Sequence, residues 1–173
     1  MSLEDCKGCR LSETRNRVVS GSGNKKSKLM FIGEAPGREE DERGKPFVGQ
    51  AGKYLDELLV LIGLQREDVY ITNIVKCRPP ENRDPLDDEI EACKGWLLEE
   101  LKNTKPKIII TLGVNAGSVF KHDLVIKKDH GTVMRMGIVS IFFSYHPAST
   151  LYNKKNRVVM EEDFKKLKKM LLY

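Results

Sequence analysis

Short apolar runs alternate along the chain with segments of helical periodicity. The runs are KLMFIG (28–33), VYITNI (69–74), KIIITLG (107–113) and IVSIFFSYH (138–146). Continuous stretches of Ile, Val and Phe of this length are typical of strands that are covered on both faces in a parallel sheet. The pattern therefore predicts four buried parallel strands.

Between and after these runs, apolar residues recur at intervals of three and four, which is the spacing of one helix face. One helix should end near Gly63, a second should begin at Asp84–Pro85, a short one should cover VNAGSVF after Gly113, and a fourth should close the chain. The three long stripes consist of Ala51, Leu55, Leu58 and Ile62; of Ile90, Cys93, Leu97 and Leu101; and of Met160, Phe164, Leu167 and Leu171. Strands that alternate with helices predict an α/β layer fold, and we expect residues 1–173 to form one domain.

Unusual loops follow all four apolar runs. They are the glycine-rich GEAPGREEDERGKPFVGQAG (33–52), NIVKCRPPENRDP (73–85), GVNAG (113–117) and YHPAS (145–149). In parallel α/β folds, ligands bind beyond the carboxyl ends of the strands, where such loops meet. We therefore expect a functional site at this edge of the sheet.

Four residues in these loops carry candidate chemistry. Glu34 ends the first run, where a carboxylate can act as a base, hold water or bind a metal. Phe47 lies between glycines, and an aromatic ring on such a loop can stack on a base. Asn73 offers a hydrogen-bond donor and an acceptor together. His146 precedes a proline and can donate to a developing anion.

The four cysteines form a C-x2-C pair, Cys6 and Cys9, and a C-x15-C pair, Cys77 and Cys93. The start of the chain lacks a secretory leader, so disulfides are a poor first hypothesis and a metal site is favoured. The pattern fits a cubane iron–sulfur cluster or a tetrahedral zinc, and spacing alone does not decide between them. Ordinary buried thiols would explain Cys77 and Cys93 but not the C-x2-C pair.

The charge balance is basic, with 30 Lys and Arg against 25 Asp and Glu, a net charge of +5 and a pI of about 9.0. A basic balance fits a polyanionic partner such as nucleic acid, although any single lysine run is more often a solvated helix face. No apolar run approaches the length of a membrane span. We therefore expect a cytoplasmic protein that does not associate with membranes.

Taken together, GEAPGREEDERGKPFVGQAG, TNIVKCRPPENRDP, SYHPAS and the cysteine pattern resemble the family 4 uracil-DNA glycosylases, the iron–sulfur enzymes of archaea and bacteria. The resemblance covers almost the whole chain and keeps the order of the motifs. It implies a DNA repair enzyme that excises uracil, with a three-layer α/β/α sandwich around a central four-stranded parallel sheet. It also implies a [4Fe–4S] cluster on the four cysteines and uracil-containing DNA, single- or double-stranded, as the partner. We expect the protein to be a monomer.

The same resemblance implies a role for each motif residue. Two residues, Glu34 and Asn82, would hold the attacking water, and His146 would face the O2 side of uracil, either neutral or charged. Uracil itself would be bound by the amide of Ala35, by stacking on Phe47, by the amide of Asn73 at the O4/N3 edge, and by Glu40, which would block the methyl group of thymine. The cluster would be structural, because hydrolysis of the glycosidic bond requires no metal.

The chain departs from the family pattern after HPA. Where the family usually has Leu-Leu-Arg, this chain has Thr150, Leu151 and Tyr152. Leu151 is still expected to wedge into the minor groove, and Tyr152 or Arg157 is a candidate DNA contact. A sliding-clamp contact is a further possible partnership.

Two other functions compete with excision. A related binding protein that captures uracil-DNA but turns over poorly would carry a basic, His-containing insertion between Cys77 and Cys93, and RPPENRDPLDDEIEA contains neither feature. An electron-transfer or redox-sensing iron–sulfur protein would explain the cysteines but not Phe47, Asn73 and His146.

Overall fold

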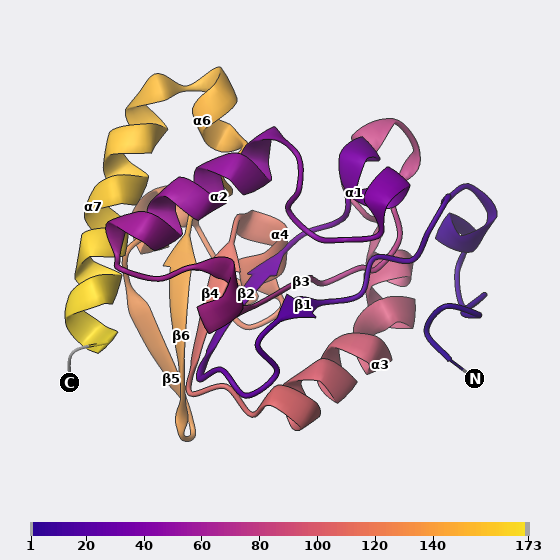
Figure 1. The fold of residues 1–173 in the computed structure, drawn as a ribbon, viewed down its shortest axis with the longest axis horizontal. Helices are drawn as coiled ribbons and strands as arrows, with labels where there is room; N and C mark the ends of the chain where they lie inside the picture. The colour runs from indigo at the N-terminus through magenta and orange to yellow at the C-terminus, as the bar shows by residue number, and fades with distance from the viewer. Residues whose placement is uncertain (1, 172–173) are drawn as a thin grey trace.

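A computed structural model describes residues 2–171, and its centre is a six-stranded sheet with the order β1-β3-β2-β4-β6-β5. Figure 1 shows the sheet between layers of helices. The strands are β1 (Ser22–Gly23), β2 (Leu29–Gly33), β3 (Tyr70–Asn73), β4 (Ile108–Leu112), β5 (Val133–Met136) and β6 (Val139–Ser144). The four inner strands β3, β2, β4 and β6 pair in parallel.

These four inner strands confirm the predicted parallel sheet, but the whole sheet has six strands and not four. Two short antiparallel edge strands extend it: β1 beside β3 and β5 beside β6. Both lack the signal of a buried strand. Strand β1 has only two residues, and most of β5 is exposed, so it forms because a turn at Gly137 folds it back onto β6.

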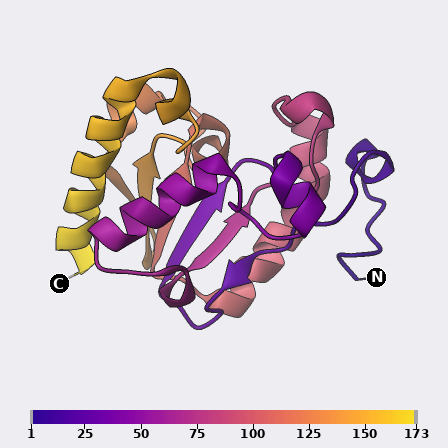
Figure 2. The same ribbon diagram turned by 45° about the horizontal axis from the view of Figure 1, so that its top comes forward.

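Helices cover both faces of the sheet, as the three-layer prediction requires. Side chains alternate along β2: Leu29 and Phe31 pack with α2 (Gln50–Leu61) and α7 (Lys154–Leu171), whereas Met30 and Ile32 pack with α3 (Asp87–Thr104) and α4 (Val114–Ser118). Figures 1 and 2 show α2 and α7 together on one side of the sheet and α3 on the other. The core therefore consists of two apolar layers, one on each face.

The loops contain short elements that apolar periodicity does not reveal. They are α1 (Arg38–Arg43), α5 (Ile126–Asp129), α6 (Ser149–Tyr152) and the 3-10 turns η1 (Arg10–Glu13), η2 (Arg66–Asp68) and η3 (Pro80–Asn82). Helix α3 begins at Asp87, three residues after the expected Asp84, because the carboxylate of Glu89 accepts the N–H of Leu86 and caps the first turn there. None of the helices described in residues 2–171 is long and apolar enough to cross a membrane.

Candidate active site

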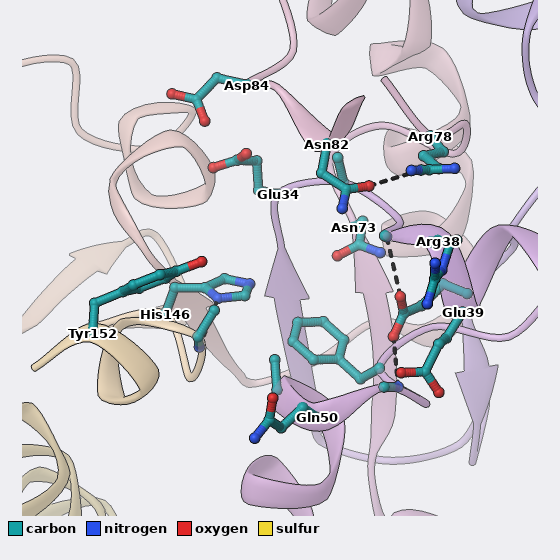
Figure 3. A pocket seen from close by; sticks show the side chains of 17 residues that line it. Glu34, Arg38, Glu39, Gln50, Asn73, Arg78, Asn82, Asp84, His146 and Tyr152 are labelled. Atoms are coloured by element: carbon teal, nitrogen blue, oxygen red, sulfur yellow. Dashed lines mark hydrogen bonds between the residues drawn. The ribbon is translucent and has the colours of Figure 1, made fainter. Parts of the chain in front are cut away.

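A cavity of about 650 Å³ lies at the carboxyl edge of the parallel strands, where the predicted loops converge. Figure 3 shows this cavity from close by. Its lining contains most of the predicted site residues: Glu34, Ala35, Glu40, Phe47, Asn73, Asn82, His146 and Tyr152. Leu151 and Arg157 do not line it. The sequence therefore predicted the position of the cavity and most of its walls.

Gly33, the last residue of β2, leaves room for two side chains that line the cavity. A Cβ atom added to Gly33 would lie 2.4 Å from the ring of Phe47 and 2.5 Å from Oδ1 of Asn73, so only glycine leaves room for both. Asn73 ends the neighbouring strand β3 and is 2% exposed. Its Oδ1 is buried and has no hydrogen-bond partner. Because a buried polar atom without a partner is costly, this amide is suited to bind a polar ligand edge.

The backbone holds Phe47 in an unusual conformation, with a φ of 53°. The guanidinium of Arg66 donates to the carbonyls of Phe47 and Pro46, and it pairs with Asp56. A Cβ atom at Gly52 would lie 1.8 Å from the Phe47 carbonyl oxygen, so helix α2 can approach this carbonyl only through glycine. The ring is thereby fixed as one wall of the cavity, which is typical of strained residues at functional sites.

His146 lines the cavity beside Phe47: the centroids of the two rings lie 5.7 Å apart, and the ring planes differ by 29°. Nδ1 of His146 accepts the backbone N–H of Ala148 at 3.1 Å, so the proton of the neutral ring is on Nε2. Burial lowers the pKa of His146 to about 4, and the nearby Glu40 carboxylate only partly opposes this shift. The side chain is therefore a neutral imidazole near pH 7 that offers Nε2–H as a donor.

Glu40, from α1, fastens two parts of the glycine-rich loop together. Its carboxylate accepts the N–H of Gly37 at 3.1 Å, of Val48 at 2.9 Å and of Gly49 at 2.8 Å. Hydrogen bonds to a carboxylate are stronger than those between neutral groups. Glu40 therefore holds the turn before α1 next to the segment that directly follows Phe47.

Glu34 lies beside a second carboxylate that the sequence analysis did not single out, Asp84. Figure 3 shows their carboxyl groups close together. Nδ2 of Asn115, at the start of α4, donates to Oε2 of Glu34 at 2.8 Å. Burial raises the pKa of Glu34, Asn115 partly lowers it, and the charge and hydrogen bond of Asp84 raise it further. The pair is thus arranged to hold a proton or a polarised water molecule.

Asn82 comes from the 3-10 turn between β3 and α3, where both Glu81 and Asn82 have a φ of 55°. Nε of Arg78 donates to Oδ1 of Asn82 at 2.7 Å, as Figure 3 also shows. With its oxygen engaged, the amide of Asn82 presents its N–H groups to the cavity. The amide of Asn82 can donate to a water molecule, and this water can in turn donate to the carboxylates of Glu34 and Asp84.

The candidate DNA contacts lie at and beyond the mouth. Tyr152, on the short helix α6, lines the cavity and is 90% exposed, and the neighbouring Leu151 is 47% exposed. Arg157, on α7, is engaged elsewhere: its guanidinium pairs with Glu57 and Glu161 and lies 4.7 Å from the centroid of the Tyr54 ring. Leu151 and Tyr152 are therefore exposed near the mouth, whereas the guanidinium of Arg157 is held by other partners.

All four cysteines line a second, much smaller cavity between the N-terminal segment and α3. Three N–H groups donate to their sulfur atoms: Nη1 of Arg15 to Cys77 at 3.3 Å, Nε1 of Trp96 to Cys6 at 3.4 Å, and the backbone N–H of Lys76 to Cys93 at 3.3 Å. Burial raises the pKa of the Cys93 thiol to about 11. Within residues 2–171, no group of three Cys, His, Asp or Glu side chains is arranged so that it could already hold a metal ion.

Three polar residues at the site were not predicted from the sequence: Arg78 and Asp84, which line the main cavity, and Asn115, which does not line it but donates to Glu34. Arg78 and Asp84 lie in the loop NIVKCRPPENRDP, and Asn115 lies in GVNAG, so all three belong to loops that were expected at this edge. Their polar side chains beside Asn82 and Glu34 were the available signal. Only the folded arrangement reveals which side chain each of them contacts.

Comparisons with known proteins agree with this geometry. Residues 20–171 match the family model of the uracil DNA glycosylase superfamily. The chain is 48% identical to a type-4 uracil-DNA glycosylase of Saccharolobus solfataricus, over 98% of this chain and 83% of the relative. Type-4 enzymes of Archaeoglobus fulgidus and Thermotoga maritima are 45% and 40% identical, over 95% and 98% of this chain and 87% and 91% of the relatives. This chain therefore belongs to the uracil-DNA glycosylase superfamily and, within it, to the type-4 uracil-DNA glycosylases.

Proposed function

We propose that this protein, as one domain of residues 1–173, hydrolyses the N-glycosidic bond of uracil in DNA and leaves an abasic site and free uracil. One observation carries the proposal: the buried amide of Asn73, whose Oδ1 has no partner, faces the cavity beside the ring of Phe47. An aromatic wall with an unpaired amide is suited to a flat heterocycle that has both a donor and an acceptor. The target nucleotide must leave the base stack to reach this cavity.

Uracil is recognised by shape and by one hydrogen-bonding edge. Its ring stacks on Phe47. The amide of Asn73 donates from Nδ2 to O4 and accepts the N3–H at Oδ1, which satisfies the unpaired oxygen. Cytosine presents the reverse pattern at this edge and is rejected. Glu40 fills the space that the 5-methyl group of thymine would need.

Cleavage breaks the bond between N1 of uracil and C1′ of the sugar. The bonding electrons move to uracil, which leaves as an anion with charge on O2. The Nε2–H of neutral His146 and the backbone N–H of Ala35 donate to this oxygen. Preorganised donors at a developing charge are usually the largest single contribution to catalysis. The hydrogen bond from the N–H of Ala148 to Nδ1 of His146 supports this role of His146, because it leaves the ring proton on Nε2.

Water completes the reaction from the side of Glu34 and Asn82. The amide N–H of Asn82 donates to the water, and the carboxylate of Glu34 accepts one of its protons as the oxygen bonds to C1′. The negative charge of Glu34 also stabilises the cationic character of the sugar. Asn115 keeps the carboxylate in place through its 2.8 Å hydrogen bond.

The cysteines Cys6, Cys9, Cys77 and Cys93 would hold a [4Fe–4S] cluster. The donor set fits: four thiols line one cavity, and three N–H groups point at their sulfur atoms. The cluster would cross-link the N-terminal segment to the loop after β3 and to α3, and it would take no part in hydrolysis. Anaerobically purified protein should contain about four irons per chain. Stoichiometric zinc without iron would overturn the assignment.

The proposal also covers DNA binding. A monomer binds single- or double-stranded DNA across the mouth of the cavity. Leu151 wedges into the space that the flipped nucleotide leaves, and Tyr152 contacts the DNA next to it. Arg157 would reach phosphate only by exchanging its partners Glu57 and Glu161. Because basic side chains release counterions from phosphate, the affinity for DNA should fall steeply as salt is raised. We also propose that the protein contacts a sliding clamp during DNA repair.

The activity is tested with an oligonucleotide that contains one uracil, followed by alkaline cleavage at abasic sites. A matched oligonucleotide with cytosine in place of uracil is the control. Strand cleavage only of the uracil substrate is the expected result. Tight binding of uracil-DNA without release would favour a capture protein, and reversible redox chemistry without release would favour an electron-transfer protein.

A further inference from the structure

Lys76 is a buried charge that the proposed mechanism does not use. Its side chain is 0% exposed. The ammonium donates to three oxygen atoms at short range: the backbone carbonyl of Asn73 at 2.7 Å, Oγ1 of Thr72 at 2.6 Å and Oε2 of Glu100 at 2.7 Å. One of these acceptors belongs to the peptide of the residue whose amide faces the base cavity. Lys76 therefore touches the backbone of the recognition residue from behind.

Glu100, on α3, pairs with Lys76 and accepts further hydrogen bonds from its neighbours. Besides Lys76, its carboxylate accepts the backbone N–H of Gly21 at 2.8 Å and the hydroxyl groups of Thr72 at 2.7 Å and Tyr70 at 3.3 Å. A buried ion pair is costly to form and is stable only when its remaining groups are satisfied, as they are here. The network consequently has one preferred arrangement.

The other end of this turn is held by the cysteine cavity. The backbone N–H of Lys76 donates to Sγ of Cys93 at 3.3 Å, and the next residue, Cys77, lines the same cavity. Residues 73–77 thus form a turn with its first carbonyl held by the Lys76 side chain and its end held beside the thiols. The base cavity and the cysteine cavity share this turn.

From this arrangement we infer that Lys76 is a positioning residue for base recognition: its ammonium fixes the Asn73 peptide, and thereby the direction of the amide that reads the base. The inference rests on the proposed function. Without the ammonium, the carbonyl of Asn73 loses this partner, and the hydrogen bond from the N–H of Ile74 to the carbonyl of Gly33, at 2.9 Å, is left to hold the peptide on its other side. A tilt of the peptide about this remaining bond would turn the side-chain amide away from the O4/N3 edge. The contacts of the DNA strand at the mouth would stay unchanged.

The ion pair also contributes to stability, so the test must separate stability from positioning. Lys76→Met removes the ammonium and leaves Glu100 without its charge partner. The double variant Lys76→Met with Glu100→Gln removes both charges and keeps an amide oxygen for Gly21 and Tyr70. The single variant Glu100→Gln is the matched control, because it breaks the same ion pair but leaves the Lys76 side chain as a donor to Asn73.

Three quantities are measured for each variant: the single-turnover rate of uracil excision from a single-stranded oligonucleotide, the Kd for that oligonucleotide with a tetrahydrofuran abasic analogue, and Tm. Both variants that lack Lys76 should excise uracil at least about tenfold more slowly, as expected for one displaced buried hydrogen-bonding group. Their Kd for the abasic analogue should stay within about twofold of the unmodified protein, since no phosphate contact changes. Glu100→Gln should lower Tm but keep the rate within about threefold.

Wild-type excision by the double variant would overturn the inference, and so would an equal loss of rate in Glu100→Gln. A parallel weakening of rate and abasic-DNA affinity would also overturn it, because it would indicate a general structural defect. Lack of excision by the unmodified protein would instead overturn the proposed function, and this inference with it. If Lys76→Met alone fails to fold, the double variant decides.

Discussion

The inner and outer halves of the cavity differ in how completely the protein shapes them. The inner half, defined by Gly33, Phe47 and Asn73, is buried: Phe47 is 5% exposed and Asn73 is 2% exposed. The outer half, defined by Asn82, Asp84 and Tyr152, is open to solvent, and Tyr152 is 90% exposed. Sterically required glycines and buried hydrogen bonds fix the inner half, whereas the outer half is fixed mainly by local contacts within its own loops.

This difference indicates when each half acquires its working geometry. The inner half is shaped before any substrate binds, so base recognition needs little reorganisation. In the proposed function DNA covers the mouth and excludes water from the outer half, which increases the electrostatic effect of its carboxylates. Changes in the inner half should therefore alter which base is accepted, and changes in the outer half should alter rate and DNA affinity.

The largest effect is expected at the boundary between the halves, for Glu34→Gln. Loss of the carboxylate that accepts a proton from water should slow excision by about 10²-fold or more. Because the deprotonated form is active and the pKa of Glu34 is raised, the wild-type rate should fall as the pH drops through a value above that of an ordinary glutamate. His146, with a pKa of about 4, should add no inflection near neutral pH. Single-turnover rates measured from about pH 4.5 to about pH 9 test this.

Asp84→Asn sharpens the same test. Asp84 raises the pKa of Glu34 through its charge and its hydrogen bond, so removing its charge should move the acid limb of the pH–rate profile to lower pH. The rate on the plateau should change less than in Glu34→Gln. An unchanged acid limb in Asp84→Asn would show that another group controls it.

The second prediction applies one chemical change to both halves. Asn73→Asp replaces the amide donor at O4 of uracil with an acceptor and should slow uracil excision by about 5- to 150-fold, equivalent to about 1–3 kcal/mol. Asn82→Asp keeps an oxygen for Arg78 and should cost no more than about tenfold. Parallel assays on uracil and cytosine substrates measure both. Equal losses in the two variants would contradict the division into halves, and wild-type excision by Asn73→Asp would contradict the assignment of base recognition.

The sequence predicted the fold well wherever burial dominates. Strands β2, β3, β4 and β6 are apolar on both faces, so a continuous Ile, Val and Phe run was a sufficient signal. The edge strands and the short helices α1, α5 and α6 depend on pairing and on turn geometry, which leave little periodicity in the sequence. For the same reason helix α3 was expected to start too early: its start is set by the hydrogen bond between Glu89 and Leu86.

The site was predictable in its members but not in its internal contacts. Glu34, Asn73 and His146 end or closely follow buried strands, so the topology brings them to one edge. Phe47 lies beyond α1, and its position depends on Arg66 and Gly52. The tautomer of His146 and the partners of Glu34 depend on backbone and side-chain positions that no spacing encodes. Glu40 illustrates the limit: the family resemblance implied a wall against the thymine methyl group, and the structure adds that its carboxylate accepts three backbone N–H groups.

The third prediction concerns this double role of Glu40. Glu40→Gly should open space for the methyl group and allow release of thymine opposite guanine, where the mispair lowers the cost of flipping. It should also slow uracil excision by about tenfold, because three loop N–H groups lose their acceptor. Glu40→Gln, which keeps the size and one oxygen, is the control and should still exclude thymine. Normal uracil excision without thymine release in Glu40→Gly would place the methyl-excluding wall elsewhere.

The smallest effect is expected at the outermost residue. Tyr152 is 90% exposed, so its replacement should disturb no packing. If position 152 faces phosphate, Tyr152→Arg should tighten DNA binding by only about two- to threefold, because an exposed charge is well screened. The dependence of log K on log salt should steepen by about one unit, as expected for one added phosphate contact. Tyr152→Gln, which adds no charge, is the control, and binding should be titrated at several salt concentrations. An unchanged salt dependence in Tyr152→Arg would mean that position 152 lies away from the DNA backbone. A large loss of uracil excision would mean that the inner half of the cavity extends to the mouth.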